Sequence, residues 1–217
     1  MVLDRKRESV DPILSVVAQY FIRINPDVLT WLALFFAFIS GSFFYFSSAE
    51  FELVNYYLFI AAFFVFLNGL FDAVDGKVAK MTDKATLRGD FLDHALDRYA
   101  DVFIIGGIAL SSWCRPSIGL LAIVGVLLTS YMGTQAQAIG CKRDYSGLLG
   151  RADRLVLLMV LPVVQHIWLR FTYDFPFEIT VLEWVLIYFA IMGNITALQR
   201  FYSTLKWFKK GNNIKNR

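Results

Sequence analysis

The chain has 217 residues, of which 57% are hydrophobic, 17% are aromatic and only 18% are charged, and its net charge is +3. This composition is typical of an integral membrane protein and excludes an ordinary soluble domain. A small positive charge carried by short basic loops is explained by topology and by contact with anionic lipid, so no nucleic-acid partner is expected.

Residues 1–27 are predicted to form a cytoplasmic N-terminus that contains a juxtamembrane amphipathic helix. This helix is expected from Pro12 to Ile24, because a proline is favoured in the first turn of a helix. Its apolar face would consist of Ile13, Val16, Val17, Tyr20 and Phe21. A helix with this pattern is expected to lie along the membrane interface.

Three uncharged runs are about as long as the roughly 20 residues that a helix needs to cross a bilayer. They are Val28–Ser48, Leu53–Phe71 and Pro116–Cys141. Each of these runs is predicted to be a transmembrane helix.

Three further uncharged runs are too short to cross a membrane alone, so each must extend through charged neighbours. These runs are Val102–Trp113, extended through Asp93 and Asp97; Leu155–Leu169, extended through Arg154; and Val185–Gln199, extended through Arg200. Ionisable groups at membrane depth are costly and usually functional. The predicted fold class is an all-α polytopic membrane bundle of six transmembrane helices over residues 28–205, followed by a basic cytoplasmic tail, residues 206–217.

The basic residues indicate how this bundle is oriented. Nearly all of them precede Val28, lie around Lys77–Arg88 and Lys142–Arg154, or follow Arg200. The positive-inside rule therefore places both termini in the cytoplasm of a multi-pass protein of the cell membrane.

The opposite side would carry Arg115 and Arg170, with Trp113 and Trp168 in an aromatic belt. Cys114 would lie on this outer side and Cys141 near the cytoplasm, which is too far apart for a disulfide.

Four aspartates mark the candidate site. Asp72 and Asp75 are three residues apart at the end of the second span, and Asp93 and Asp97 are four apart in the third, so each pair lies on one helix face. For any one of them alone, a solvated helix end is an equally good interpretation. Four carboxylates gathered at membrane depth repel one another unless cations are bound, and magnesium or manganese bound by carboxylates commonly also binds substrate phosphate.

The spacing of these residues matches a known signature. The pattern Asp72-x-x-Asp75-Gly76-x-x-Ala79-Lys80, then eight residues, then Gly89-x-x-x-Asp93-x-x-x-Asp97 resembles that of the CDP-alcohol phosphotransferases. The position of Lys80 usually carries an arginine in that family, and lysine lacks the planar fork that holds two phosphate oxygens.

The resemblance implies a mechanism. Asp72, Asp75 and Asp93 would bind two divalent cations, Mg²⁺ or Mn²⁺, with Asp97 also near the metals and acting as the general base that activates the acceptor hydroxyl. The residues expected to contact the CDP group are Thr30, Asp72, Asp75, Gly76, Ala79, Lys80 and Gly89. The donor would be CDP-diacylglycerol or CDP-archaeol, the leaving group CMP, and the protein a homodimer, as family members often are.

Three arginines point to the acceptor. Arg151, Arg154 and Arg200 begin or end the last two spans, and arginine suits bidentate recognition of phosphate. They favour a phosphorylated alcohol over serine or ethanolamine, although arginines also anchor helix ends to lipid phosphates.

The segments Ser130–Gly133, Gln135–Ala138 and Gly150–Leu155 resemble phosphatidylinositol-phosphate and archaetidylinositol-phosphate synthases. Gly133 and Gln135 replace a lysine and an arginine of that subgroup, and Lys142 or Arg143 is the candidate substitute. Inositol 1-phosphate is therefore the favoured acceptor, and glycerol 3-phosphate is the alternative.

Two other protein classes bind cations through membrane carboxylates. An intramembrane prenyltransferase uses differently spaced acids and more spans, and a divalent-cation transporter is expected to carry acids near the midplane. Of the remaining polar residues, Asp90 and Asp101 are expected to pair with Arg88, Arg98 or loop lysines, and His94 to be a polar filler.

Overall fold

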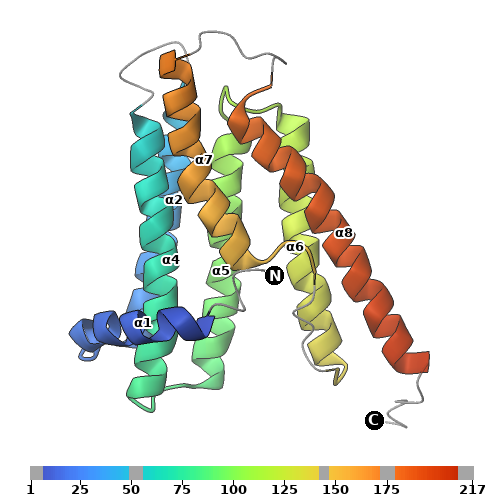
Figure 1. The fold of residues 1–217 in the computed structure, drawn as a ribbon. Coiled ribbons are helices and arrows are strands. Elements are labelled where there is room, and N and C mark those ends of the chain that lie inside the picture. Colours follow the sequence, from blue (N-terminus) through green and yellow to red (C-terminus); the bar gives the residue numbers. More distant parts are fainter. Residues whose placement is uncertain (1–6, 49–55, 142–146, 172–178, 210–217) are drawn as a thin grey trace.

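The protein is described by a computed structural model that covers residues 7–48, 56–141, 147–171 and 179–209, and in these residues it contains helices and no strand. Figure 1 shows long helices running side by side and one short helix crossing them. The helices are α1 (Arg7–Phe21), α2 (Pro26–Phe46), α4 (Tyr57–Met81), α5 (Leu87–Ala109), α6 (Pro116–Ala138), α7 (Arg151–Phe171) and α8 (Val181–Lys209).

Two helices that build the site begin at capping residues. At α2, the Asn25 side chain accepts a hydrogen bond from the backbone N–H of Asp27 at 3.1 Å, and Pro26 occupies the first turn. At α5, the Thr86 hydroxyl accepts from the backbone N–H of Gly89 at 3.0 Å. Both caps satisfy N–H groups that have no partner within the helix.

Five of the described helices, α2, α4, α6, α7 and α8, are long and apolar enough to cross a membrane. The chain is therefore an all-α multi-pass membrane protein. Helix α5 differs because Asp90, Asp93, Asp97 and Asp101 are distributed over its first two thirds, and only the last third, after Asp101, is apolar. Three helices extend through charged residues, as predicted: α5 includes Asp93 and Asp97, α7 begins at Arg151, and α8 continues beyond Arg200.

The helices pack closely where glycines meet. A Cβ atom added to Gly41 of α2 would lie 2.2 Å from the carbonyl oxygen of Phe103 in α5, and one added to Gly107 would lie 2.1 Å from the carbonyl oxygen of Gly41. On the other side of the molecule, Gly125 of α6 and Gly193 of α8 bring those two helices together. Small residues at these positions allow backbones in a membrane to touch.

Helix α1 lies across the lower part of α4 in Figure 1. Val17, Ala18 and Phe21 pack against a small core that includes Leu29 of α2 and Val74 of α4. This corrects the predicted helix in two ways. It begins at Arg7 with Pro12 inside it and ends at Phe21, and three residues of the expected single face, Ile13, Val16 and Tyr20, point away from the bundle and are exposed.

The end of the bundle that contains the connection between α5 and α6 is called the loop end here. Trp113 is buried there, and its indole N–H donates to the Ser47 hydroxyl at 2.7 Å. It is therefore not part of an exposed aromatic belt as predicted, whereas Trp168 is exposed. Arg115 pairs with the buried Glu183 through its Nε at 2.7 Å. Both cysteines are free, as expected.

Candidate functional site

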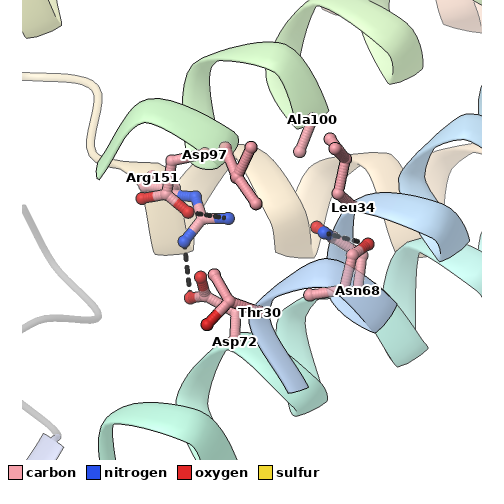
Figure 2. Close-up of a pocket in the computed structure, with 9 residues that line it drawn as sticks. Thr30, Leu34, Asn68, Asp72, Asp97, Ala100 and Arg151 are labelled. Carbon is pink, nitrogen blue, oxygen red and sulfur yellow. Dashed lines mark hydrogen bonds and ion pairs between the residues drawn. The ribbon is translucent and has the colours of Figure 1, made fainter. Parts of the chain in front are cut away.

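The four predicted aspartates lie on two helices, Asp72 and Asp75 on α4 and Asp93 and Asp97 on α5. Arg151, the first residue of α7, joins one residue of each pair. Its Nη1 lies 2.5 Å from Asp72 Oδ2, and its Nη2 lies 2.7 Å from Asp97 Oδ1. Figure 2 shows the guanidinium group between the two carboxylates. The structure thus brings α4, α5 and α7 together at one charged site, which we call the acid end of the bundle.

The second oxygen of Asp97 is also held. Arg98 Nη2 lies 3.1 Å from Asp97 Oδ2, and Arg98 Nη1 donates to the Ser130 hydroxyl of α6. Asp97 is almost fully buried. A buried carboxylate clamped between two guanidinium groups has a fixed orientation, because each charge-assisted hydrogen bond restricts its rotation.

The carboxylates suit a divalent cation. Donor atoms of Asp93, His94 and Asp97 all lie within 4.8 Å of one another. Asp75 is buried, and its Oδ2 has no hydrogen-bond partner among the described residues. A buried carboxylate oxygen of this kind is costly unless it is paired. Oxygen donors from aspartates are the ligands that Mg²⁺ and Mn²⁺ prefer, so the residues present fit the predicted cations.

A narrow pocket opens beside these acids. Its lining residues come from α2, α4, α5 and α7 and are Thr30, Ala33, Leu34, Asn68, Asp72, Leu96, Asp97, Ala100 and Arg151. The sequence analysis missed Asn68, which lies four residues before Asp72 on the same face of α4. Its amide donates to the Ala33 carbonyl at 2.9 Å, and its Oδ1 is buried without a partner among the described residues. The signal that could have identified Asn68 is the presence of a polar residue inside an otherwise uncharged span.

The residues predicted to contact a nucleotide are placed around this pocket and the C-terminal end of α4. Thr30 lines the pocket, and its hydroxyl donates to the Pro26 carbonyl at 3.1 Å. Gly76 is exposed, and a Cβ added there would meet no atom within 4 Å. Ala79 is half-buried and Lys80 exposed on the following turn. Space for a ligand therefore exists beside Gly76.

The other two predicted acceptor arginines also have buried partners. Arg154 Nη2 lies 2.7 Å from Asp101 Oδ2, and both side chains are buried. Arg200 Nη1 donates to the carbonyl of Thr129 at 2.7 Å. A Cβ added to Gly133 would lie 3.0 Å from the same Arg200 nitrogen, so the glycine leaves room for this side chain.

The partners of Asp90 and Asp101 differ from those predicted. Asp101 pairs with Arg154, and Asp90 lies 3.5 Å from His94. Asp101 was missed as a site residue although it continues the face of α5 that carries Asp97. His94, which was expected to be a polar filler, has a ring nitrogen close to donor atoms of Asp93 and Asp97. Lys142 and Arg143, the proposed substitutes for Gly133 and Gln135, lie outside the described residues.

Comparison with known sequences gives one family. The sequence model described as CDP-alcohol phosphatidyltransferase matches residues 23–196. An archaetidylinositol phosphate synthase from Pyrococcus horikoshii is 27% identical over 165 residues, which cover 76% of this chain and 79% of the relative. A phosphatidylinositol phosphate synthase from Cutibacterium acnes is 27% identical over 207 residues, which cover 91% of this chain and 95% of the relative.

Comparison with solved structures agrees. A crystal structure of the phosphatidylinositol phosphate synthase of Mycobacterium tuberculosis with CDP-DAG bound superposes with a TM-score of 0.67. Its sequence is 25% identical, and the match covers 89% of this chain and 94% of the other. The arrangement of helices described above is therefore shared over almost the whole of both chains.

Proposed function

Because the chain belongs to the CDP-alcohol phosphatidyltransferase family, we propose that it transfers the phosphatidyl or archaetidyl group of a CDP-linked lipid to a phosphorylated alcohol and releases CMP. The observation that supports this function best is that Asp72 and Asp97, from two different helices, both pair with Arg151 at the acid end of the bundle. Their spacing and that of Asp75 and Asp93 follow the family signature, and their oxygens suit the cations that the reaction requires.

The donor side of the site consists of the four aspartates. Asp72, Asp75 and Asp93 would hold two divalent cations, Mg²⁺ or Mn²⁺, with Asp97 beside them. When bound, these cations neutralise the pyrophosphate of the CDP group and the charge that develops on the departing CMP. The open surface at Gly76 and the small side chain of Ala79 would admit the nucleotide, with Thr30, Lys80 and Gly89 around it.

Asp97 is the proposed general base. It would take the proton of the acceptor hydroxyl through Oδ1 once Arg151, which contacts that oxygen in this structure, moves away, while Oδ2 stays paired with Arg98. The hydroxyl oxygen then forms a bond to the lipid-linked phosphorus, and the bond between this phosphorus and the oxygen of CMP breaks. A fixed carboxylate is suited to this step, since general bases act at hydrogen-bond distance.

The acceptor is proposed to be inositol 1-phosphate, with glycerol 3-phosphate as the alternative. Two of the relatives described above are named for inositol-phosphate products. Arg154 and Arg200 are buried near the acid end and would bind the acceptor phosphate, with Arg151 as a third candidate. The buried guanidinium groups are suited to a phosphate and not to an uncharged alcohol.

The membrane arrangement is proposed to include α5 as a sixth span. Its 23 residues give a length of about 35 Å, which is enough to cross the hydrocarbon core. Helix α1 would lie at the cytoplasmic interface, with both termini and the acid end facing the cytoplasm, as the distribution of lysine and arginine predicts. The proposed division of the chain remains residues 1–27, 28–205 and 206–217.

A homodimer is proposed to form through α5 and α6. An apolar groove of about 400 Å³ runs between them, lined by residues that include Phe103, Gly106, Leu110 and Leu120. Leu110 and Leu120 are largely exposed. Small and apolar surfaces of this kind mediate contacts between membrane helices.

The reaction is tested by CMP release from purified protein given a CDP-lipid, Mg²⁺ or Mn²⁺ and one acceptor at a time. Inositol 1-phosphate, glycerol 3-phosphate, free inositol and serine should be compared side by side. We expect release with a phosphorylated acceptor and none after Asp93→Asn. Release that persists in this variant would refute the mechanism, and reaction with serine or free inositol alone would refute the acceptor.

A further inference from the structure

Arg151 occupies two of the carboxylates that the proposed cations need. It contributes one nitrogen to Asp72 at 2.5 Å and another to Asp97 at 2.7 Å, so its planar fork spans two helices from a third. Its side chain is only 20% exposed. A carboxylate oxygen engaged by a guanidinium group at this distance is not available to a metal ion at the same time.

The other arginines at the acid end are bound differently. Arg98 contacts the far oxygen of Asp97 and is anchored to Ser130, while Arg154 contacts Asp101, which is outside the proposed cation ligands. Asp72 has an ion pair only with Arg151 among the described residues. Departure of Arg151 would therefore leave Asp97 still oriented by Arg98 but would release Asp72 completely.

From this geometry we propose that Arg151 competes with divalent cations for Asp72 and Asp97, so that it sets the cation affinity of the site and leaves these carboxylates when cations bind. The inference rests on the proposed function, because it takes these aspartates as cation ligands. Two ligands that exclude one another from shared atoms weaken each other's binding by the same factor. The protein thus carries an internal cation that stabilises its acid end before metal arrives.

The competition is tested by binding of Mn²⁺ alone, with no lipid or acceptor present. Protein in lipid nanodiscs is titrated with Mn²⁺, and free Mn²⁺ is measured by its electron paramagnetic resonance signal. Arg151→Gln removes the competing charge, and we expect Mn²⁺ to bind on the order of tenfold more tightly. Arg151→Lys keeps the charge but loses the fork, and its affinity should lie between those of Arg151→Gln and the wild type.

The matched control is Arg154→Gln. It removes the same charge one helical turn further along α7, but its partner is Asp101. If both glutamine variants bind Mn²⁺ with equally increased affinity, the effect is a general one of charge and the proposal is wrong. Unchanged or weaker binding by Arg151→Gln would also contradict it. If neither the wild type nor any variant binds Mn²⁺, the proposed function itself fails.

Thermal unfolding supplies a second measurement that also identifies a variant that does not fold. Without metal, Arg151→Gln should unfold at a lower temperature than the wild type, because Asp72 then loses its ion pair and no guanidinium group separates it from Asp97. Addition of Mn²⁺ should raise its unfolding temperature more than that of the wild type, since tighter binding to the native state gives larger stabilisation. An equal rise in both proteins would overturn the competition.

Discussion

Both ends of the bundle contain buried charged groups, but the ratio of acidic to basic residues differs between them. At the loop end one acid meets one base: Glu183 accepts from the Arg115 side chain at 2.7 Å and from its backbone N–H at 3.0 Å. At the acid end, the group of carboxylates and guanidinium groups around Arg151 contains five aspartates and three arginines among the described residues. They are Asp72, Asp75, Asp93, Asp97 and Asp101 with Arg98, Arg151 and Arg154.

This difference separates a structural ion pair from a binding site. At the loop end the acid is matched by one base, and Thr180 and Ser47 extend the network through Trp113. At the acid end the carboxylates exceed the arginines, and Asp75 retains an unpaired buried oxygen among the described residues. Excess negative charge in a region of low polarity is relieved by protonation or by a bound cation, so the imbalance favours a site for a cation.

The strongest test of the comparison is Asp97→Asn at the acid end. An amide cannot accept the hydroxyl proton, so kcat should fall by about 10²- to 10⁴-fold. The measurement is initial CMP release at saturating CDP-lipid and inositol 1-phosphate. Activity close to that of the wild type would show that another group is the base.

Arg154→Ala should affect one substrate more than the other. A hydrogen bond to a charged group contributes about 1.5–3 kcal/mol, so the acceptor KM should rise by roughly ten- to a hundredfold. The KM for the CDP-lipid should change little, because the carboxylates that hold the donor remain. Equal increases in both values would argue against a dedicated acceptor pocket and for a role limited to the Asp101 pair.

Glu183→Gln at the loop end should behave in the opposite way. The neutral amide oxygen should accept weaker hydrogen bonds from Arg115 than the carboxylate does, so the thermal unfolding temperature should fall. The value of kcat should stay within about twofold of the wild type, because the sites are far apart and independent. A large loss of kcat at unchanged stability would remove the distinction between the two ends.

The smallest expected effect concerns Cys114. Burial, followed by the nearby Glu183 carboxylate, raises the pKa of this thiol to about 11. At pH 8 only on the order of one thiol in a thousand is ionised, so maleimide labelling should be slow and should accelerate as the pH rises toward 11. Labelling is measured in a Cys141→Ser background. Addition of Glu183→Gln should lower the pKa of the Cys114 thiol and increase the labelling rate. An unchanged rate would mean that burial alone raises this pKa.

The sequence predicts the donor part of the site well because that part is local. Asp72 and Asp75 share one helix turn, as do Asp93 and Asp97, so helical periodicity already places each pair. The sequence predicts the ion pairs poorly, because they join segments that are far apart along the chain. Arg151 and Asp72 are 79 positions apart, and Arg154 and Asp101 are 53 apart. Only folding brings these side chains into contact.

Errors in the predicted fold have a related cause. The apolar pattern of α1 predicted a helix but not which residues face the bundle, because Ile13, Val16 and Tyr20 suit a lipid surface as well as a protein core. Trp113 looked like a residue of an aromatic belt, yet its N–H reaches Ser47, 66 positions away. In both cases hydrophobicity alone does not distinguish lipid from protein as the partner.

The glycines of the molecule should fall into two groups in a library of all single substitutions. Positions 41 and 107 leave no space for a side chain, so their variants should be lost when cells are sorted for the amount of folded protein. Position 76 has space around it, so its variants should survive that sorting and be lost only when growth depends on lipid synthesis. The same amino acid would then report assembly at one place and substrate access at another.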